Sequence, residues 1–130
     1  MPVTRHASRY VRFLNLVNAV RQMPTLPVLD AVEERLLGAV LTAWLAGRQV
    51  PVTEAARMEQ GTPERTAFRR IKSLHEKGLL DFEPSPDDHR VKFIVPTPTA
   101  ERYFDALGRC LEQARDSLWP HTNPLESSSK

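Results

Sequence analysis

The sequence predicts a mainly α-helical α+β fold with one small β-hairpin and long helices at both ends of the chain. Three observations predict it. A short helical segment, a glycine-containing turn and a strongly basic helical segment follow one another between residues 52 and 78. Two segments that partly alternate apolar and polar residues, as half-buried strands do, come directly afterwards. Near both termini, apolar residues recur at helical spacing.

Composition limits the class of protein. The 130 residues are enough for one domain with a real core, and the net charge of +2 is too small to indicate a nucleic-acid partner by itself. No apolar run approaches the length of a membrane span, and no secretory signal is recognisable. A single cysteine excludes an intramolecular disulfide and fits a reducing compartment. We therefore expect a cytoplasmic protein that does not enter the membrane.

The basic segment at residues 62–78 has both of its ends marked in the sequence. Thr62 is a suitable N-cap and Pro63 suits the first helical position. Gly78 can close the helix in the left-handed conformation, and Lys77 suits the negative end of the helix dipole. These signals predict a helix of about four turns.

The two faces of this helix differ in chemistry. At about 100° per residue, Ala67, Phe68, Ile71 and Leu74 share one side, with His75 at its edge, and we expect them to anchor the helix. Residues 65–77 carry five cations against one anion. Arg can bind guanine edges or phosphates, and short hydroxyl side chains let the backbone approach DNA. The candidate DNA-facing residues are Thr62, Arg65, Thr66, Arg69, Ser73 and, at the border, Arg70. The alternative interpretation is an ordinary solvated basic helix.

The segments on either side of this helix favour DNA binding. Before it, Thr53 is expected to cap a short helix that reaches Met58, and Gly61 suits the turn, so the pair forms a helix-turn-helix. After it, residues 79–84 and 90–95 are expected to form a hairpin with a polar tip, which makes the motif a winged helix-turn-helix. Arg90 can enter a minor groove beside the wing, and Asp88 can pair with it. The alternative is a surface hairpin that only covers the core.

The remaining helices are expected at residues 8–22, 30–46 and 97–119. Asp30 is a candidate N-cap of the second, whose broad apolar surface indicates a buried helix, and Thr97 is a candidate N-cap of the last. We divide the chain into an N-terminal helix with a basic arm (1–28), the winged helix-turn-helix (29–96), a C-terminal helix (97–119) and a flexible tail (120–130).

The first and last helices have long apolar stripes, which predict that they pack against a second copy of the chain. Packing of both helices within one chain is the alternative. The residues expected at the homodimer interface are Tyr10, Phe13, Leu14, Val17, Tyr103, Phe104, Leu107, Leu111 and Leu118.

From residue 52 to residue 100 the sequence resembles the multiple-antibiotic-resistance regulator (MarR) family of bacterial transcription factors. Residues 53–56 resemble the start of the family's first motif helix, 66–74 its recognition helix, 77–80 the step into the wing and 87–90 its acidic-then-Arg wing signature. Ala100 stands where the family usually has Gly, Pro96 where it has Leu, and no separate sixth helix is visible. The resemblance implies a homodimer that reads a pseudo-palindromic site, often released by a small ligand or an oxidant.

Enzymatic and metal sites are not expected. The four histidines lie far apart in the sequence, without Cys or His partners at metal-ligand spacing, and no phosphate loop or nucleophile motif is present. Cys110 lies on the apolar stripe of the last helix, where a buried packing thiol is expected rather than an oxidant sensor.

The sequence therefore predicts a DNA-binding transcriptional regulator, a repressor in the first instance, with double-stranded DNA and a second copy of itself as partners, a small-molecule effector of unknown identity and no cofactor. Two alternatives stay open: a winged-helix module that binds protein instead of DNA, and a DNA-binding protein of plasmid maintenance or replication.

Overall fold

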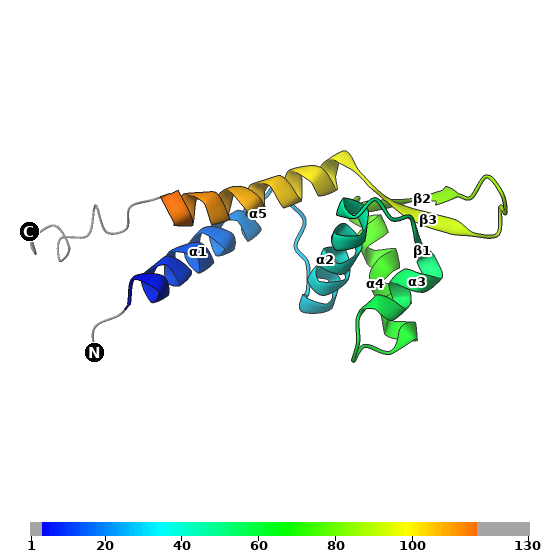
Figure 1. Ribbon diagram of the computed structural model, residues 1–130, viewed down its shortest axis with the longest axis horizontal. Coiled ribbons are helices and arrows are strands. Elements are labelled where there is room, and N and C mark those ends of the chain that lie inside the picture. The colour runs from blue at the N-terminus through cyan, green and yellow to red at the C-terminus, as the bar shows by residue number, and fades with distance from the viewer. Residues whose placement is uncertain (1–3, 117–130) are drawn as a thin grey trace, which may run out of the picture. The chain divides into compact units, whose positions relative to one another are not determined.

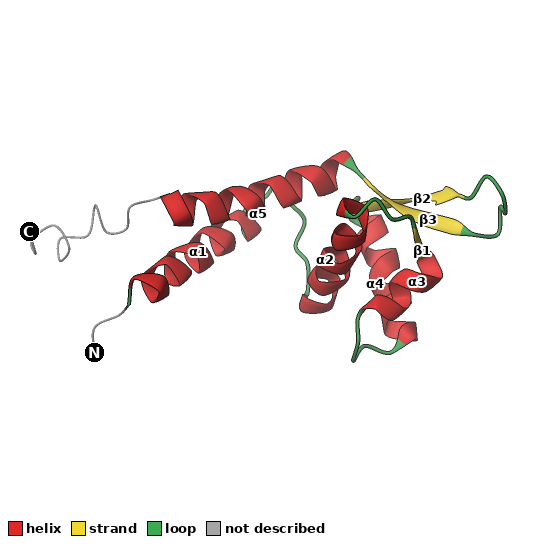
Figure 2. Cartoon of the chain, in the orientation of Figure 1, coloured by secondary structure: helices red, strands yellow, loops and turns green. Residues whose placement is uncertain are grey.

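The computed structural model describes residues 4–116, and Figures 1 and 2 show its helices and strands. The predicted α+β fold is confirmed. The chain forms two compact units, one from Met1–Pro27 with Arg102–Lys130 and one from Val28–Glu101. The elements in order are α1 (Arg5–Arg21), α2 (Ala31–Leu45), β1 (Val50–Pro51), α3 (Val52–Met58), α4 (Glu64–Glu76), β2 (Leu80–Pro84), β3 (Lys92–Pro96) and α5 (Pro98–Asp116).

Helix α2 is the buried helix of the second unit. The predicted N-cap Asp30 is confirmed, since its carboxylate accepts from the backbone amide of Glu33 at 2.8 Å. The Glu33 side chain accepts from the Asp30 amide at 2.8 Å, which completes a capping box. Leu36, Leu37 and Val40 are at most 1% exposed. The capping box therefore fixes where this helix begins, and burial of its apolar face fixes which side points into the core.

Helices α3 and α4 each begin after a proline, and neither predicted threonine cap is correct. Helix α4 begins at Glu64 with Pro63 as its N-cap, and α3 begins at Val52 with Pro51 as its N-cap. Neither cap makes a side-chain hydrogen bond. The backbone ψ of Pro63 is 144°, so this residue is still extended and the helix starts one position later than predicted.

The C-terminal end of α4 is as predicted. Gly78 has a φ of +78°, its amide donates to the carbonyl of His75, and the amide of Leu79 donates to the carbonyl of Leu74, both at 3.0 Å. This is the Schellman arrangement that a glycine at this position favours. The chain can therefore turn directly from α4 into β2.

The three strands form one antiparallel sheet in the order β1-β3-β2. Phe82 of β2 and Val50 of β1 are both in register with Ile94 of β3. The Ile94 side chain is 1% exposed, and its carbonyl accepts from Nε1 of Trp44 at 2.9 Å. The predicted hairpin is thus present, with its second strand starting at residue 92 rather than 90. Arg90 consequently lies in the turn.

The beginning of α5 is tied to the end of α4 through Thr97, whose predicted capping role is confirmed. Its Oγ1 accepts from the amide of Ala100 at 3.1 Å and donates to the carbonyl of Gly78 at 2.6 Å. The Thr97 hydroxyl thus caps the N-terminus of α5 and also donates to the Gly78 carbonyl, just after the end of α4. The predicted end of this helix, with Leu118, and the predicted tail lie outside the described residues.

In the other unit, α1 begins at Arg5, earlier than predicted, because the Thr4 hydroxyl accepts from the amide of Ala7 at 3.0 Å. Its most buried residue is Val17, 5% exposed. Tyr103, Cys110 and Ala114 of α5 are buried in the same unit, at 2–3% exposed.

None of the helices within residues 4–116 has the length and apolar character that crossing a membrane requires.

We predict that Thr97→Ala lowers the free energy of unfolding by about 1–2 kcal/mol, because it removes an N-cap and leaves the Gly78 carbonyl without its hydroxyl donor. Urea denaturation followed by circular dichroism measures the change. Thr53→Ala is the matched control: Thr53 is exposed, and we expect a change within about 0.5 kcal/mol. Equal losses in the two variants would contradict the assigned role of Thr97.

Candidate nucleic-acid interface

Helix α4 packs against the core along one side. Ala67, Ile71 and Leu74 are at most 2% exposed and pack within the unit that also holds α2 and α3. The predicted anchor Phe68 is not among them: 40% of it remains exposed. One residue turns the helix by about 100°, so a residue next to Ala67 can already lie beyond the edge of the buried stripe. The prediction that Phe68 fixes the helix to the core is wrong.

The side of α4 away from the core carries free cations. Arg65, Arg69 and Lys72 are exposed, and none of them has an ion-pair partner within residues 4–116. Glu64, the acid at the start of the helix, is instead paired with Arg57 of α3, whose Nε lies 2.6 Å from its carboxylate. This leaves a positive surface of three cations without ion pairs in the described chain, and the exposed Glu76 follows Lys72 by four residues on the same face.

Lys72 was not among the DNA contacts predicted from the sequence, although its spacing from two of them indicated it. It follows Arg65 by seven residues and Arg69 by three, spacings that place residues on the same face of a helix. Thr66 and Thr62, the predicted hydroxyl contacts, are half-buried beside this face. The exposed cationic stripe of α4 therefore consists of Arg65, Arg69 and Lys72.

Two of the predicted contacts are engaged with α2. The Ser73 hydroxyl donates to Oε2 of Glu33 at 2.6 Å, and Nε of Arg70 lies 2.9 Å from the Asp30 carboxylate. The prediction of a free Ser73 hydroxyl for the major groove is thus wrong. Helical periodicity placed Ser73 opposite the core, but it could not reveal that α2 lies against that flank of α4. Arg70 is 39% exposed and keeps part of its surface open.

Glu33 is the centre of this contact between α2 and α4. Although the residue is 1% exposed, its carboxylate accepts from Nζ of Lys77 at 2.7 and 2.9 Å and from the Ser73 hydroxyl. Lys77 also donates to the carbonyl of Val28 at 2.8 Å. Burial by itself raises the pKa of Glu33, but the hydrogen bonds from Lys77, Ser73 and the Asp30 amide outweigh it and hold the pKa below its ordinary value. The buried charge is thus fully compensated, and α4 is held through its C-terminal half.

The wing presents one well-directed cation. The carboxylate of Asp88 accepts from the Arg90 guanidinium at 3.1 and 3.3 Å and from the Arg90 backbone amide at 3.1 Å. These bonds lower the pKa of Asp88. The predicted pairing is therefore present, while 91% of the Arg90 side chain is exposed. Arg90 keeps its outer surface available at the tip of the hairpin.

The flank of α4 that faces β2 is aromatic. The His75 ring stacks on the Phe82 ring with centroids 4.6 Å apart, and His75 Nε2 lies 3.4 Å from the Asp81 carboxylate. His75 thus contacts the wing while 42% of its side chain stays exposed, more than the sequence predicted. Each flank of α4 is consequently held by a different neighbour, α2 on one side and β2 on the other.

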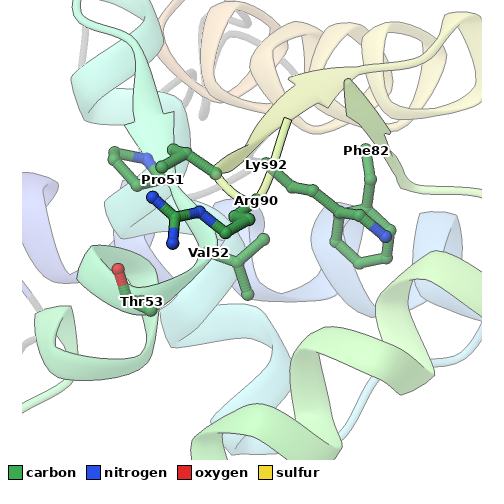
Figure 3. Close-up of a pocket in the computed structure, with 7 residues that line it drawn as sticks. Pro51, Val52, Thr53, Phe82, Arg90 and Lys92 are labelled. Carbon is green, nitrogen blue, oxygen red and sulfur yellow. The ribbon is translucent and has the colours of Figure 1, made fainter. Parts of the chain in front are cut away.

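A pocket of about 290 Å³ lies between the wing and the start of α3 (Figure 3). Pro51, Val52, Phe82 and Val91 give it an apolar lining, and Arg90 adds a cation. Thr53 and Lys92 complete the lining. Any occupant of this pocket would touch the wing residue predicted to approach DNA.

Cys110 is buried, as expected for a packing thiol, and desolvation raises its pKa. Its Sγ donates to the carbonyl of Ala106 at 3.3 Å. A raised pKa keeps the thiol protonated and slow to react with oxidants. Among residues 4–116, no group of three or more His, Cys, Asp and Glu side chains could hold a metal ion.

The predicted dimer residues within the described part of the chain differ in exposure and fall into three groups. Val17 and Tyr103 are 5% and 3% exposed, so they pack within the chain and offer no surface to a second copy. Tyr10, Leu14 and Leu111 are 60%, 38% and 61% exposed. Phe13, Phe104 and Leu107 have intermediate exposure. Part of each apolar stripe therefore packs within the chain, and another part stays exposed and could contact a second copy.

Neither the family models nor the curated proteins include a match to this chain. Solved structures do match its fold. A MarR-like transcriptional regulator of Thermotoga maritima, Tm0816, is 19% identical, with a TM-score of 0.59 over 85% of this chain and 73% of that one. MepR of S. aureus in complex with DNA is 15% identical, with a TM-score of 0.61 over 93% and 80%. BpsR of Bordetella bronchiseptica, whose DNA binding is regulated by 6-hydroxynicotinic acid, is 19% identical, with a TM-score of 0.52 over 93% and 81%.

We predict that Glu33→Gln lowers the free energy of unfolding at pH 7 by about 1–3 kcal/mol, because Lys77 loses its buried counter-charge. The pKa of Glu33 is lowered by folding, so its contribution to stability is present above the unfolded value near 4.5 and is lost as the pH falls through the folded pKa. The difference between the two proteins should therefore shrink in acid. Urea titrations at several pH values measure it.

Glu76→Gln is the matched control, because Glu76 is an exposed carboxylate on α4. We expect this variant to follow the wild type at every pH within about 0.5 kcal/mol. A pH-independent effect of Glu33→Gln would contradict the assigned charge at this site.

Proposed function

On the premise that this chain has the MarR-like winged helix-turn-helix fold, we propose that it is a sequence-specific regulator of transcription that binds double-stranded DNA. The observation that carries the proposal is the stripe of Arg65, Arg69 and Lys72, exposed on a helix whose other flanks are held by α2 and β2. Cations at this density attract phosphate and release its counterions. The DNA bound by MepR, a protein of the same fold, supports the proposal.

In this proposal each residue has a defined role. Arg65, Arg69 and Thr66 face the major groove, where Arg can bond guanine edges. Thr62, Arg70 and Lys72 lie nearer to phosphate. Arg90 enters the neighbouring minor groove, with Asp88 holding its direction. Ser73 is left out, because its hydroxyl is bonded to Glu33. No catalytic residue is part of the proposal.

We propose that the regulator is a homodimer on a pseudo-palindromic operator and that it acts as a repressor, since occupying promoter DNA is enough to block transcription. Exposed apolar residues of α1 and α5, Tyr10, Leu14 and Leu111, support the dimer. A two-fold axis would place two α4 helices about 34 Å apart, in successive major grooves. The cytoplasm, where the chromosome is accessible, is the location we propose.

A small-molecule effector belongs to the proposal as well. The regulation of BpsR by 6-hydroxynicotinic acid supports it at the level of the fold. The pocket beside Arg90 is the place where such a ligand would compete with the wing's approach to DNA. Binding assays repeated with small aromatic acids test this point, and operator affinity that none of them changes would count against it.

We predict that Arg69→Ala lowers affinity for the operator by about 1–3 kcal/mol if Arg69 reads a base, with little loss on random DNA. If it binds phosphate only, both DNAs lose equally and the salt dependence becomes shallower. Fragments selected from genomic DNA supply the operator, and gel shifts at several salt concentrations measure the affinity.

Arg109→Ala is the control for Arg69→Ala. Arg109 is exposed on α5, in the other compact unit, and is paired with Asp105 at 2.6 Å, so removing it changes a similar charge on a different helix. Unchanged affinity of Arg69→Ala for both DNAs would remove Arg69 from the contact set. Wild-type binding without salt dependence would refute DNA binding and favour the protein-binding winged helix.

We predict that Leu111→Glu converts the protein to a monomer and weakens operator binding more than tenfold, because it places a charge in an apolar interface. Light scattering after size-exclusion chromatography measures the mass. Gln113→Glu adds the same charge at another exposed position of α5 and should leave the dimer intact. A dimer that survives Leu111→Glu would place the interface elsewhere.

A further inference from the structure

Phe68 is a large apolar side chain that borders the cationic stripe, between Lys72 and the buried Ile71 around the helix. It lies three residues after Arg65 and four before Lys72, so these two cations are its neighbours along the helix surface. Arg69 follows it directly. From residue 65 to residue 75 the helix contains no acid, and Glu64 is paired with Arg57. The 40% of Phe68 that is exposed therefore has positive charge along one side, that of Arg65 and Lys72.

Phe68 is not part of the fully buried side of α4. Ala67, Ile71 and Leu74 already form the buried side of α4 at 0–2% exposure. An exposed apolar group beside a row of cations fits a partner that is apolar at one point and negative next to it. The major groove has this character, because the C5-methyl group of thymine projects into a groove bordered by phosphates. Phe68 also lies in the second turn of α4, and the N-terminal residues of recognition helices are those that contact base edges.

We propose that Phe68 determines sequence specificity by contacting the C5-methyl group of a thymine in each half-site. This inference rests on the proposed function, in which α4 enters the major groove. The phenyl ring has no charge and no hydrogen-bonding group, so it adds discrimination between bases without adding a phosphate contact. Arg65, Arg69 and Lys72 supply the attraction that brings the ring to the groove floor.

The test replaces each operator thymine in turn by deoxyuridine, which removes one methyl group and leaves base pairing intact. For the wild-type protein we expect one symmetry-related pair of positions at which affinity falls by about fourfold per methyl group, the value of one buried methylene-sized group. Phe68→Ala should bind both versions of that operator equally and as weakly as the wild type binds the uracil version. Its salt dependence should equal that of the wild type.

Lys72→Ala is the matched control on the same stripe. It should bind more weakly with a shallower salt dependence, yet keep the full difference between thymine and uracil. Phe68→Leu, which keeps an apolar side chain, should retain part of that difference. It also guards against the case in which the alanine variant is unstable, and unfolding curves of both variants establish that they are folded.

The outcomes separate the two levels of the proposal. If the wild type binds DNA with a steep salt dependence but ignores every thymine methyl, the role of Phe68 is refuted and DNA binding stands. The same holds if Phe68→Ala keeps the difference between thymine and uracil. If the wild type shows no salt-dependent binding, the proposed function fails and this inference fails with it.

Discussion

The carboxylate of Glu33 is the constraint on which the arrangement of the second unit depends. It is almost completely buried, and it remains charged because Lys77, Ser73 and the backbone amide of Asp30 all donate to it. An unpaired buried charge would be expensive, so α4 can pack against α2 only where these donors reach Glu33. The Glu33 contact thus restricts both the axial position and the rotation of α4 against α2. The same residue also completes the capping box of α2.

The rotation of α4 determines what each of its sides faces. The small and aliphatic residues face the core, Arg70, Ser73 and Lys77 face α2, and His75 stacks on the wing. What remains exposed is the stripe of Arg65, Arg69 and Lys72, with the exposed part of Phe68 at its border. The surface proposed to read DNA is therefore the side of the helix that the core, α2 and β2 leave uncovered. Its chemistry, a row of charges with an apolar group beside it, matches the major groove.

The sequence predictions were correct where the interaction that determines the structure joins residues close together in the chain. Asp30 and Thr97 cap helices as expected, because each side chain bonds to a backbone amide three residues along the chain. Thr62 and Thr53 failed, because the neighbouring prolines hold the backbone extended and move the cap. Phe68 and Ser73 were misplaced for a different reason. Periodicity gives the angle between residues on a helix, but not how far a neighbouring element reaches around it.

The sequence by itself determined the kinds of element, their order and the basic character of α4, because capping, turn chemistry and apolar periodicity act over a few residues. It also predicted the pairing of Asp88 with Arg90, two residues apart. Only the tertiary structure decided which polar residues of α4 are free. That choice depends on Glu33, forty residues before Ser73, and a contact between residues so distant in the chain leaves no periodic trace in the sequence.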